Sequence, residues 1–228
     1  MISSMKSGRL TAACVTGLGL LSLAGLDAAD WTLMSRRDGI EIYRREMPGS
    51  PLVVFKGEGT IDAPVWKIAS ILLDTKRAPE WADSLKESRV AKRLGPAEYE
   101  EYNHLGMPLI LKDRDFLSDV VIQISDEQKA FSLVYKPADD RDLPRTHFVR
   151  GKIEYGLFEV TSLEPGRRSK LRAEIQADPK GAIPTWVVNF FQKGWPLNTF
   201  QGIRAQAAKP DIAMPPEFKD VLTPTLPF

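Results

Sequence analysis

The chain has 228 residues, of which 43% are hydrophobic and 27% are charged, and this composition is typical of a globular protein with one domain of ordinary size. The formal net charge is +1, so the composition favours no polyanionic partner and predicts no binding of nucleic acid. Transient contact with a membrane stays open, because a local patch does not show in the net charge. Cys14 is the only cysteine, which excludes disulfides and cysteine-based metal sites from a chain that begins after it.

The first 29 residues differ from the rest and are predicted to be a secretory signal peptide. Lys6 and Arg9 form a short basic region, an uncharged apolar stretch covers 10–26, and the small residues at 28–29 precede the predicted cleavage site. The alternative is an N-terminal membrane anchor, although the stretch is short for a span and contains three glycines. Cleavage predicts an exported protein, which in a bacterial cell is periplasmic.

Residues 30–208 have the pattern of one strand-rich domain. Two predicted strands are separated by a turn at 47–50, and a predicted helix follows with Asp62 as its cap and Pro64 in its first turn. Successive strands without intervening helices then predict an antiparallel meander. The predicted strands are 39–45, 52–61, 87–94, 98–104, 116–125, 130–136, 152–163 and 169–177, with a short helical piece at 79–83.

The last predicted element is a helix over 183–208 with an unusually apolar face. Gly194 and Pro196 interrupt this helix, so a kink is expected there. Beyond Ala208, five prolines in the tail of 209–228 argue against regular structure and predict an extended strap or a disordered end. The element order predicts an α+β helix-grip fold, in which a curved antiparallel sheet and a C-terminal helix enclose a hydrophobic cavity.

Four segments of the chain resemble the START (StAR-related lipid-transfer) domains of the phosphatidylcholine-transfer-protein type. Residues 38–45 are similar to the opening strand of that family, and 55–64 to its second strand and helix start. The sequence Lys-Asp-Arg-Asp-Phe at 112–116 is similar to the family's Arg-Asp-aromatic segment, and 178–186 to the lead into the terminal helix. The resemblance covers about 31–208. It implies a cavity for one lipid, no catalysis and no cofactor, and it does not identify the lipid.

The resemblance also implies where polar groups face the cavity. In the family, an acidic and a basic residue on neighbouring strands often do so. The acidic position corresponds to Glu100 or Glu101, whereas the basic position corresponds to Val120, a departure that leaves recognition of a sterol or phosphate through this pair unsupported. Tyr102 and Arg150 are further polar candidates, with an ordinary solvated strand face as the alternative for each.

Apolar cavity walls are expected on the terminal helix, because burying a lipid tail releases about 0.8 kcal/mol per CH₂. The candidates are Val187, Phe190, Phe191 and Leu197, and for each the alternative is an ordinary core residue. Trp186 is predicted to be a structural packing residue.

Two further segments receive structural interpretations. Arg114 and Asp115 are predicted to form a structural ion pair or to anchor a turn. The segment 137–147 is predicted to be a mobile gate over the cavity or, alternatively, a plain surface loop.

Enzymatic function finds little support in the residues. His104 and His147 are the only histidines and are far apart, and no metal-ligand spacing, nucleophile motif or dinucleotide fingerprint is present. We therefore expect a monomeric carrier that binds one lipid, a phospholipid, sterol or similar molecule, and moves it between membranes. The alternatives are a cyclase-like or hydrolase-like enzyme of the same broad fold class, and a lipid-sensing module that contacts a partner through the Pro-rich tail.

Overall fold

The computed structural model describes residues 31–108, 111–139 and 146–219. The predicted signal peptide, the tip of the 137–147 loop and the end of the Pro-rich tail lie outside the described residues. For Phe191 only the backbone is described.

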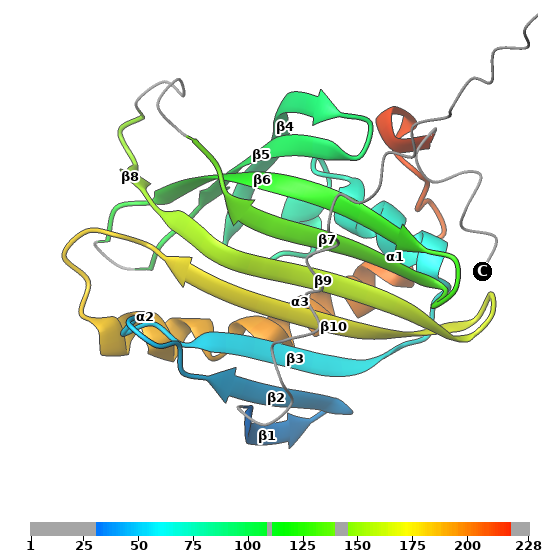
Figure 1. Ribbon diagram of the computed structural model, residues 1–228, viewed down its shortest axis with the longest axis horizontal. Helices are drawn as coiled ribbons and strands as arrows, with labels where there is room; N and C mark the ends of the chain where they lie inside the picture. Colours follow the sequence, from blue (N-terminus) through cyan, green and yellow to red (C-terminus); the bar gives the residue numbers. More distant parts are fainter. Residues whose placement is uncertain (1–30, 109–110, 140–145, 220–228) are drawn as a thin grey trace, which may run out of the picture.

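The described residues form a single sheet of ten strands in the order β1-β2-β3-β10-β9-β7-β6-β5-β4, with β8 paired in parallel to β6 (Figure 1). All other neighbours pair antiparallel, and β3 pairs with β10, so the last strand of the chain lies beside one of the first three. The strands are β1 (Thr32–Arg37), β2 (Ile40–Arg45), β3 (Val54–Ile61), β4 (Leu85–Gly95), β5 (Glu98–Leu105), β6 (Arg114–Ser125), β7 (Ala130–Pro137), β8 (Val149–Arg150), β9 (Lys152–Glu164) and β10 (Arg168–Asp178).

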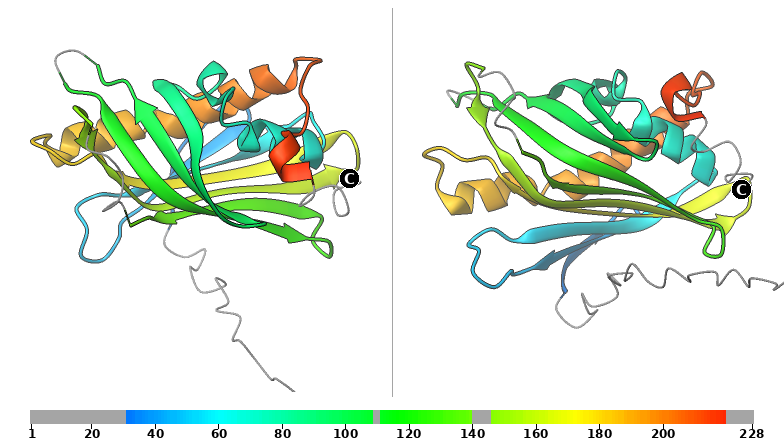
Figure 2. Two further views of the ribbon diagram at one scale, coloured as in Figure 1. Left: turned by 90° about the horizontal axis from the view of Figure 1, so that it is seen from above. Right: turned by 45° about the horizontal axis from the view of Figure 1, so that its top comes forward.

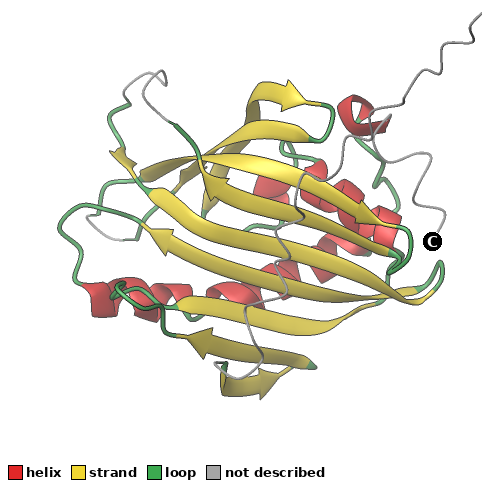
Figure 3. Cartoon of the chain, viewed as in Figure 1, coloured by secondary structure: helices red, strands yellow, loops and turns green. Residues whose placement is uncertain are grey.

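The helices lie on the concave face of this curved sheet (Figure 2). They are α1 (Val65–Leu73), α2 (Thr185–Gln192) and α3 (Trp195–Ala207), with short 3₁₀ turns η2 (Ala78–Glu80) and η3 (Pro216–Phe218). Figure 3 shows that no described helix covers the opposite face. This arrangement is the predicted α+β helix-grip fold. No helix in the described part of the chain is long and apolar enough to cross a membrane.

Two glycines of β3 allow α3 to approach the sheet closely. A Cβ atom added to Gly57 or to Gly59 would lie 2.9 Å from the ring of Phe200, closer than side chains tolerate. Phe200 and Ile203 of α3 are consequently fully buried against the sheet. The predicted kink is present as a break between α2 and α3 at residues 193–194.

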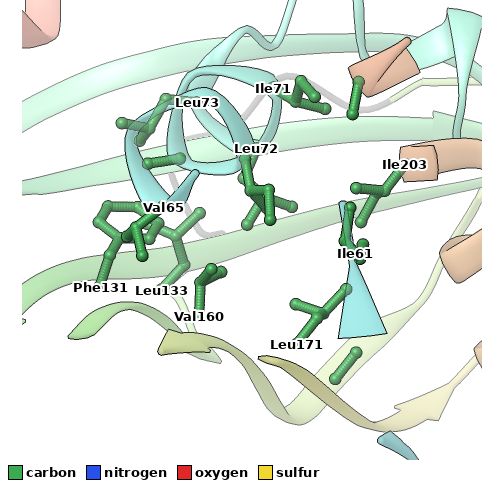
Figure 4. Close-up of a cluster of buried hydrophobic side chains, with 14 of the residues drawn as sticks. Ile61, Val65, Ile71, Leu72, Leu73, Phe131, Leu133, Val160, Leu171 and Ile203 are labelled. Carbon is green, nitrogen blue, oxygen red and sulfur yellow. The ribbon is translucent and has the colours of Figure 1, made fainter. Parts of the chain in front are cut away.

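A dense apolar core fills the space between sheet and helices at the α1 end of the molecule (Figure 4). Alternating strand residues point inward, as period-two patterning requires. The core residues labelled in Figure 4 are Ile61, Val65, Ile71, Leu72, Leu73, Phe131, Leu133, Val160, Leu171 and Ile203.

The structure departs from the sequence-based expectations at several element ends. Strands β1 and β8 were not predicted, because β1 is largely exposed and β8 has only two residues. Helix α1 begins after Pro64, which is itself the cap residue, and no side chain caps the helix. The predicted cap, Asp62, instead pairs with Arg168 at 3.1 Å.

The described part of the Pro-rich tail packs against the domain. Phe218 is 0% exposed, and its ring centroid lies 5.3 Å from that of Tyr99. The guanidinium of Arg93 lies 4.6 Å from the centroid of the same ring, and Asp211 pairs with Arg77 at 3.3 Å. The 3₁₀ turn η3 contradicts the expectation of no regular structure, because proline fits the first positions of such a turn. Residues 209–219 therefore form a strap that contributes to the core.

Candidate functional site

An inner cavity of about 160 Å³ lies between the concave face of the sheet and the helices, beside the core and toward the α2 end. Phe158 and Ile175 line it from the sheet, and Trp81 and Trp195 from the helical side. Most of its wall is apolar. Other apolar lining residues include Leu72, Leu85, Leu105, Phe116, Ile153 and Ala177.

A second, outer cavity of about 210 Å³ adjoins the first. The two share six lining residues of the described chain, among them Leu105, Phe116 and Trp195, so they form one path with a common wall. Helix α2 borders the outer cavity through Val187 and Val188. The outer cavity, which has the exposed Ser84 in its lining and is bordered by α2, is called the mouth.

The loop between β5 and β6 forms the other side of the mouth through Gly106, Met107, Pro108 and Leu111. Asp113 holds this loop: its carboxylate accepts hydrogen bonds from Lys86 Nζ at 2.9 Å and from the Met107 amide at 3.0 Å, and it lies 2.8 Å from His104 Nε2. The hydrogen bond from Lys86 is the first cause that keeps the pKa of Asp113 well below its ordinary value.

Arg114 fastens the opposite edge of the mouth. Its guanidinium donates hydrogen bonds to the carbonyls of Lys112, Pro179 and Lys180, and so joins the start of β6 to the loop that precedes α2. Arg114 therefore anchors a turn and does not pair with Asp115. Adjacent residues of a strand point to opposite faces, and Asp115 pairs instead with Arg150 at 2.8 Å.

The inner cavity contains a polar cluster that consists of Ser88, Glu101 and Asn103. In the register of β4 and β5, Val90 lies opposite Glu101 and Ser88 opposite Asn103, so all of these side chains share the inward face. The Glu101 side chain is 6% exposed, and its Oε1 accepts a hydrogen bond of 2.7 Å from Asn103 Nδ2.

Several atoms around this cluster lack hydrogen-bond partners within the described residues. They are Glu101 Oε2, Asn103 Oδ1, Ser88 Oγ, Ser118 Oγ, Tyr99 Oη and Trp81 Nε1, all of which are buried. Buried polar groups in folded proteins are nearly always paired, so such a concentration requires an explanation. A ligand or water in the cavity would provide the missing partners.

Burial raises the pKa of the Glu101 carboxyl to about 7. The hydrogen bond from Asn103 opposes this shift, as does Tyr99, whose hydroxyl lies near the carboxyl without the alignment of a hydrogen bond. Tyr135, which also lines the cavity, has a pKa raised well above its ordinary value, first by burial and then by the charge of Glu101. Near neutral pH, Glu101 therefore exists in both its protonated and its ionised form.

The described residues that line the two cavities include no lysine, arginine or histidine. Val120, which stands at the family's basic position, is 0% exposed in the core, opposite Tyr99 on β5 and Tyr135 on β7. The carboxyl of Glu101 thus lies in an apolar cavity without a neighbouring cation.

Of the residues singled out from the sequence, Glu101 lines the inner cavity and Val187 lines the outer one. Glu100 faces the other side of the sheet. Tyr102 also faces that side, because its hydroxyl lies 3.4 Å from Asp115 Oδ2, and Arg150 is held there by the same carboxylate. Period-two alternation along the strands separates these residues from the cavity.

The residues of the terminal helix that were expected to line the cavity lie on two separate helices, α2 and α3, and point in different directions. Leu197 packs against the core, and the side chain of Phe191 lies outside the described residues. Phe190 is 69% exposed. Trp186, which was expected to pack inside, is 73% exposed, because α2 turns Val188 inward and leaves Trp186 on its outer side. Of the 137–147 loop, the described flanks line neither cavity.

Sequence reasoning missed the remaining members of the polar cluster. Asn103 follows Glu101 by two residues, so strand alternation from Glu101 would have placed it on the same face. Ser88 and Trp81 come from segments whose position depends on the pairing of β4 with β5 and on the packing of η2 beneath α3. No local pattern signals these contacts.

The geometry defines a helix-grip protein with an apolar cavity that opens beside α2. The START domain matches residues 16–207 of the chain. Over 187 residues, the chain is 30% identical to the uncharacterized protein PA1579 of Pseudomonas aeruginosa. The aligned region covers 80% of this chain and 89% of that protein. The chain therefore belongs to the START family.

Solved structures share the fold. Human STARD10 superimposes with a TM-score of 0.73 at 20% identity, over 87% of this chain and 79% of that chain. The STAR-related lipid transfer protein of Xanthomonas axonopodis superimposes with a TM-score of 0.69 at 23% identity, over 79% of this chain and 99% of that chain.

Proposed function

We propose that the protein binds one lipid in the joined cavities and carries it between membranes. The observation that carries this proposal is the apolar path from the inner cavity to a mouth beside α2. Each CH₂ group that leaves water for such a path contributes about 0.8 kcal/mol, so a single alkyl chain suffices for tight binding. The name of the Xanthomonas axonopodis relative, a STAR-related lipid transfer protein, supports the same function.

We propose that α2 contacts the membrane during loading and release. Trp186 and Phe190 are the two most exposed large hydrophobic side chains in the described part of the chain, and they lie one helical turn apart on the outer side of α2. Tryptophan is favoured at the boundary between headgroups and acyl chains. Because Val187 and Val188 of the same helix border the cavity, insertion of α2 would bring the mouth to the lipid surface.

Location and assembly belong to the same proposal. The basic and apolar character of residues 1–29 supports export and a periplasmic site of action, where lipids need a carrier across water. The START match begins at residue 16, inside this segment. N-terminal sequencing of the exported protein would locate the signal-peptide cleavage site. We propose a monomer of the phosphatidylcholine-transfer-protein type, since the four resembling segments favour that scaffold without naming a ligand.

A transfer assay between donor and acceptor vesicles tests the carrier function. We expect the purified protein to accelerate movement of a fluorescent lipid, and native mass spectrometry to show one lipid per chain. Trp186→Ala should slow transfer by about tenfold while lipid loading stays unchanged, as removal of an interfacial anchor implies. The matched control is Leu163→Ala, which removes another exposed apolar side chain, 51% exposed, at the distant β9–β10 turn. Equal rates for the two variants would refute a role of α2.

One observation favours a second function. A carboxyl with a pKa of about 7 in an apolar cavity is suited to general acid–base catalysis, as a cyclase-like or hydrolase-like enzyme would require. The described residues hold no group of three or more metal-ligating side chains, so Glu101 would act without a metal from that part of the chain. We propose binding without catalysis. A bound lipid recovered with unchanged mass after incubation supports binding, and a mass change that Glu101→Gln abolishes would establish the enzyme.

A further inference from the structure

We propose that the polar cluster of Ser88, Glu101 and Asn103 receives a hydrogen-bond-donating end of the lipid, a hydroxyl or an amino group, and rejects an anionic phosphate. This inference rests on the proposed lipid-binding function and names the class of its ligand. It follows from the unpaired acceptors of the inner cavity, from the absence of cations among its described lining residues and from its size.

Two unpaired acceptors of the cluster call for a donor, and the unpaired Trp81 Nε1 beside them can donate in return, so a group that both donates and accepts, such as a hydroxyl, satisfies both. Glu101 Oε2 and Asn103 Oδ1 are acceptors without hydrogen-bond partners in the described structure, and Ser88 Oγ can accept or donate. Glu101 and Ser88 are each 6% exposed, so bulk water does not satisfy them. A ligand hydroxyl or amine that donates to these oxygens restores the bonds lost on burial.

A phosphate finds no counter-charge in this place. The polar groups that face Glu101 are Asn103 on its own strand, Ser88 on β4, Ser118 on β6, Tyr135 on β7 and Tyr99 at the core side, none of which carries a positive charge. Beyond them, the acidic Asp83 lies exposed at the mouth, and Glu174 is paired with Arg172. An anionic headgroup would therefore lose its hydration and meet a carboxyl and neutral N–H and O–H donors such as Trp81 Nε1 and Ser88 Oγ, but no counter-charge.

Size adds a second restriction. The inner cavity of about 160 Å³ and the outer one of about 210 Å³ are each smaller than the roughly 300–1,000 Å³ that typical ligand pockets provide. A ligand of lipid length must occupy both. A single chain or a compact ring system meets this limit better than a lipid with two long chains.

Hydroxyl and amine ligands differ in how they depend on pH. An ammonium group needs the ionised carboxyl, whose population rises as the pH passes about 7. A hydroxyl can donate to the ionised form and can also accept a bond from the protonated form. The ratio of bound amine to bound alcohol should therefore increase between about pH 6 and about pH 8.

A competition among three lipids with the same chain tests the inference on the unaltered full-length protein. Delipidated protein is mixed with equal amounts of hexadecanol, hexadecylamine and hexadecyl phosphate, and native mass spectrometry measures which is bound. We expect the phosphate to be bound about tenfold less than the alcohol, and the lipid that copurifies with the protein to carry a hydroxyl or an amino group. Phosphate occupancy equal to or above that of the alcohol would overturn the inference.

The variant Glu101→Gln separates the charge of the carboxyl from its shape. We expect it to lose most of the amine binding and to keep the alcohol within a few fold, whereas Glu100→Gln, which changes the same side chain on the opposite face, should match the unaltered protein. Identical ligand profiles for the two variants would contradict a role of Glu101. If none of the three compounds binds and no lipid copurifies, the lipid-binding function itself fails; if all three bind equally, only the inference about the headgroup fails.

Discussion

The burial of Glu101 has a consequence for stability that can be measured without knowing the ligand. In the unfolded chain, the carboxyl has an ordinary pKa of 4.5, whereas in the folded protein burial raises it to about 7. Below pH 4.5 the carboxyl is protonated in both the folded and the unfolded state, so it does not change the stability of the fold. As the pH rises from about 4.5 to about 7, the unfolded state loses its proton first, so the stability of the fold decreases, and above about 7 the loss is complete.

The size of the effect follows from the two pKa values. Each pKa unit corresponds to about 1.4 kcal/mol, so the difference amounts to about 3 kcal/mol of lost stability at pH 8. Glu101→Gln removes the ionisation and keeps an oxygen that can accept from Asn103. The variant should therefore be more stable than the unaltered protein by about 3 kcal/mol at pH 8, and equally stable near pH 4.5.

Urea unfolding followed by circular dichroism at several pH values between about 4.5 and about 8 measures this difference. Other titrating groups contribute equally to both proteins and cancel in the comparison. Glu100→Gln is the control, and its stability should follow that of the unaltered protein within about 0.5 kcal/mol, as for most surface substitutions. A difference between Glu101→Gln and the unaltered protein that stayed constant with pH would refute the reasoning.

Two further predictions concern the scaffold. Phe218→Ala should lower the free energy of unfolding by about 3–5 kcal/mol, because it removes a fully buried ring from contact with Tyr99 and Arg93. Urea unfolding measures this loss, and a loss below about 1 kcal/mol would show that the strap does not contribute to the core. Gly57→Ala should lower it by about 1–3 kcal/mol, because the new Cβ would lie 2.9 Å from the Phe200 ring and push α3 away from β3. Thermal unfolding checks the Gly57→Ala prediction. An unchanged melting temperature would mean that α3 moves to accommodate the new Cβ without loss of stability.

Much of the fold could be predicted from the sequence because its strands are long and alternate strictly. The eight predicted strands all exist, and their bounds shift by one or two residues at most ends. The break between α2 and α3 was also predictable, since glycine and proline interrupt helices by their own geometry. What local patterns could not supply was β8, whose two residues pair with the distant Arg114 and Asp115 and whose Arg150 is ion-paired with Asp115.

The candidate site was less predictable because it depends on which face of each element turns inward. The family resemblance did not decide whether Glu100 or Glu101 holds the acidic position that faces the cavity. Only the strand register of β4, β5 and β6 shows that Glu101 points inward. On the terminal helix the difficulty was different. The apolar face was treated as one surface, but the break at 193–194 lets α2 rotate independently of α3, so that Trp186 points outward while Phe200 packs inside.

The two ends of the molecule have opposite physical demands. At the α1 end, close-packed side chains and the strap of residues 209–219 supply the stability of the fold. At the α2 end, the chain keeps a hollow, a cluster of unpaired polar atoms and a buried carboxyl, each of which destabilises the empty protein. A ligand that fills the hollow and donates to Glu101 would relieve these costs, so occupancy and stability should rise together. Tyr99 joins the two ends, since its ring packs on Phe218 while its hydroxyl lies near Glu101.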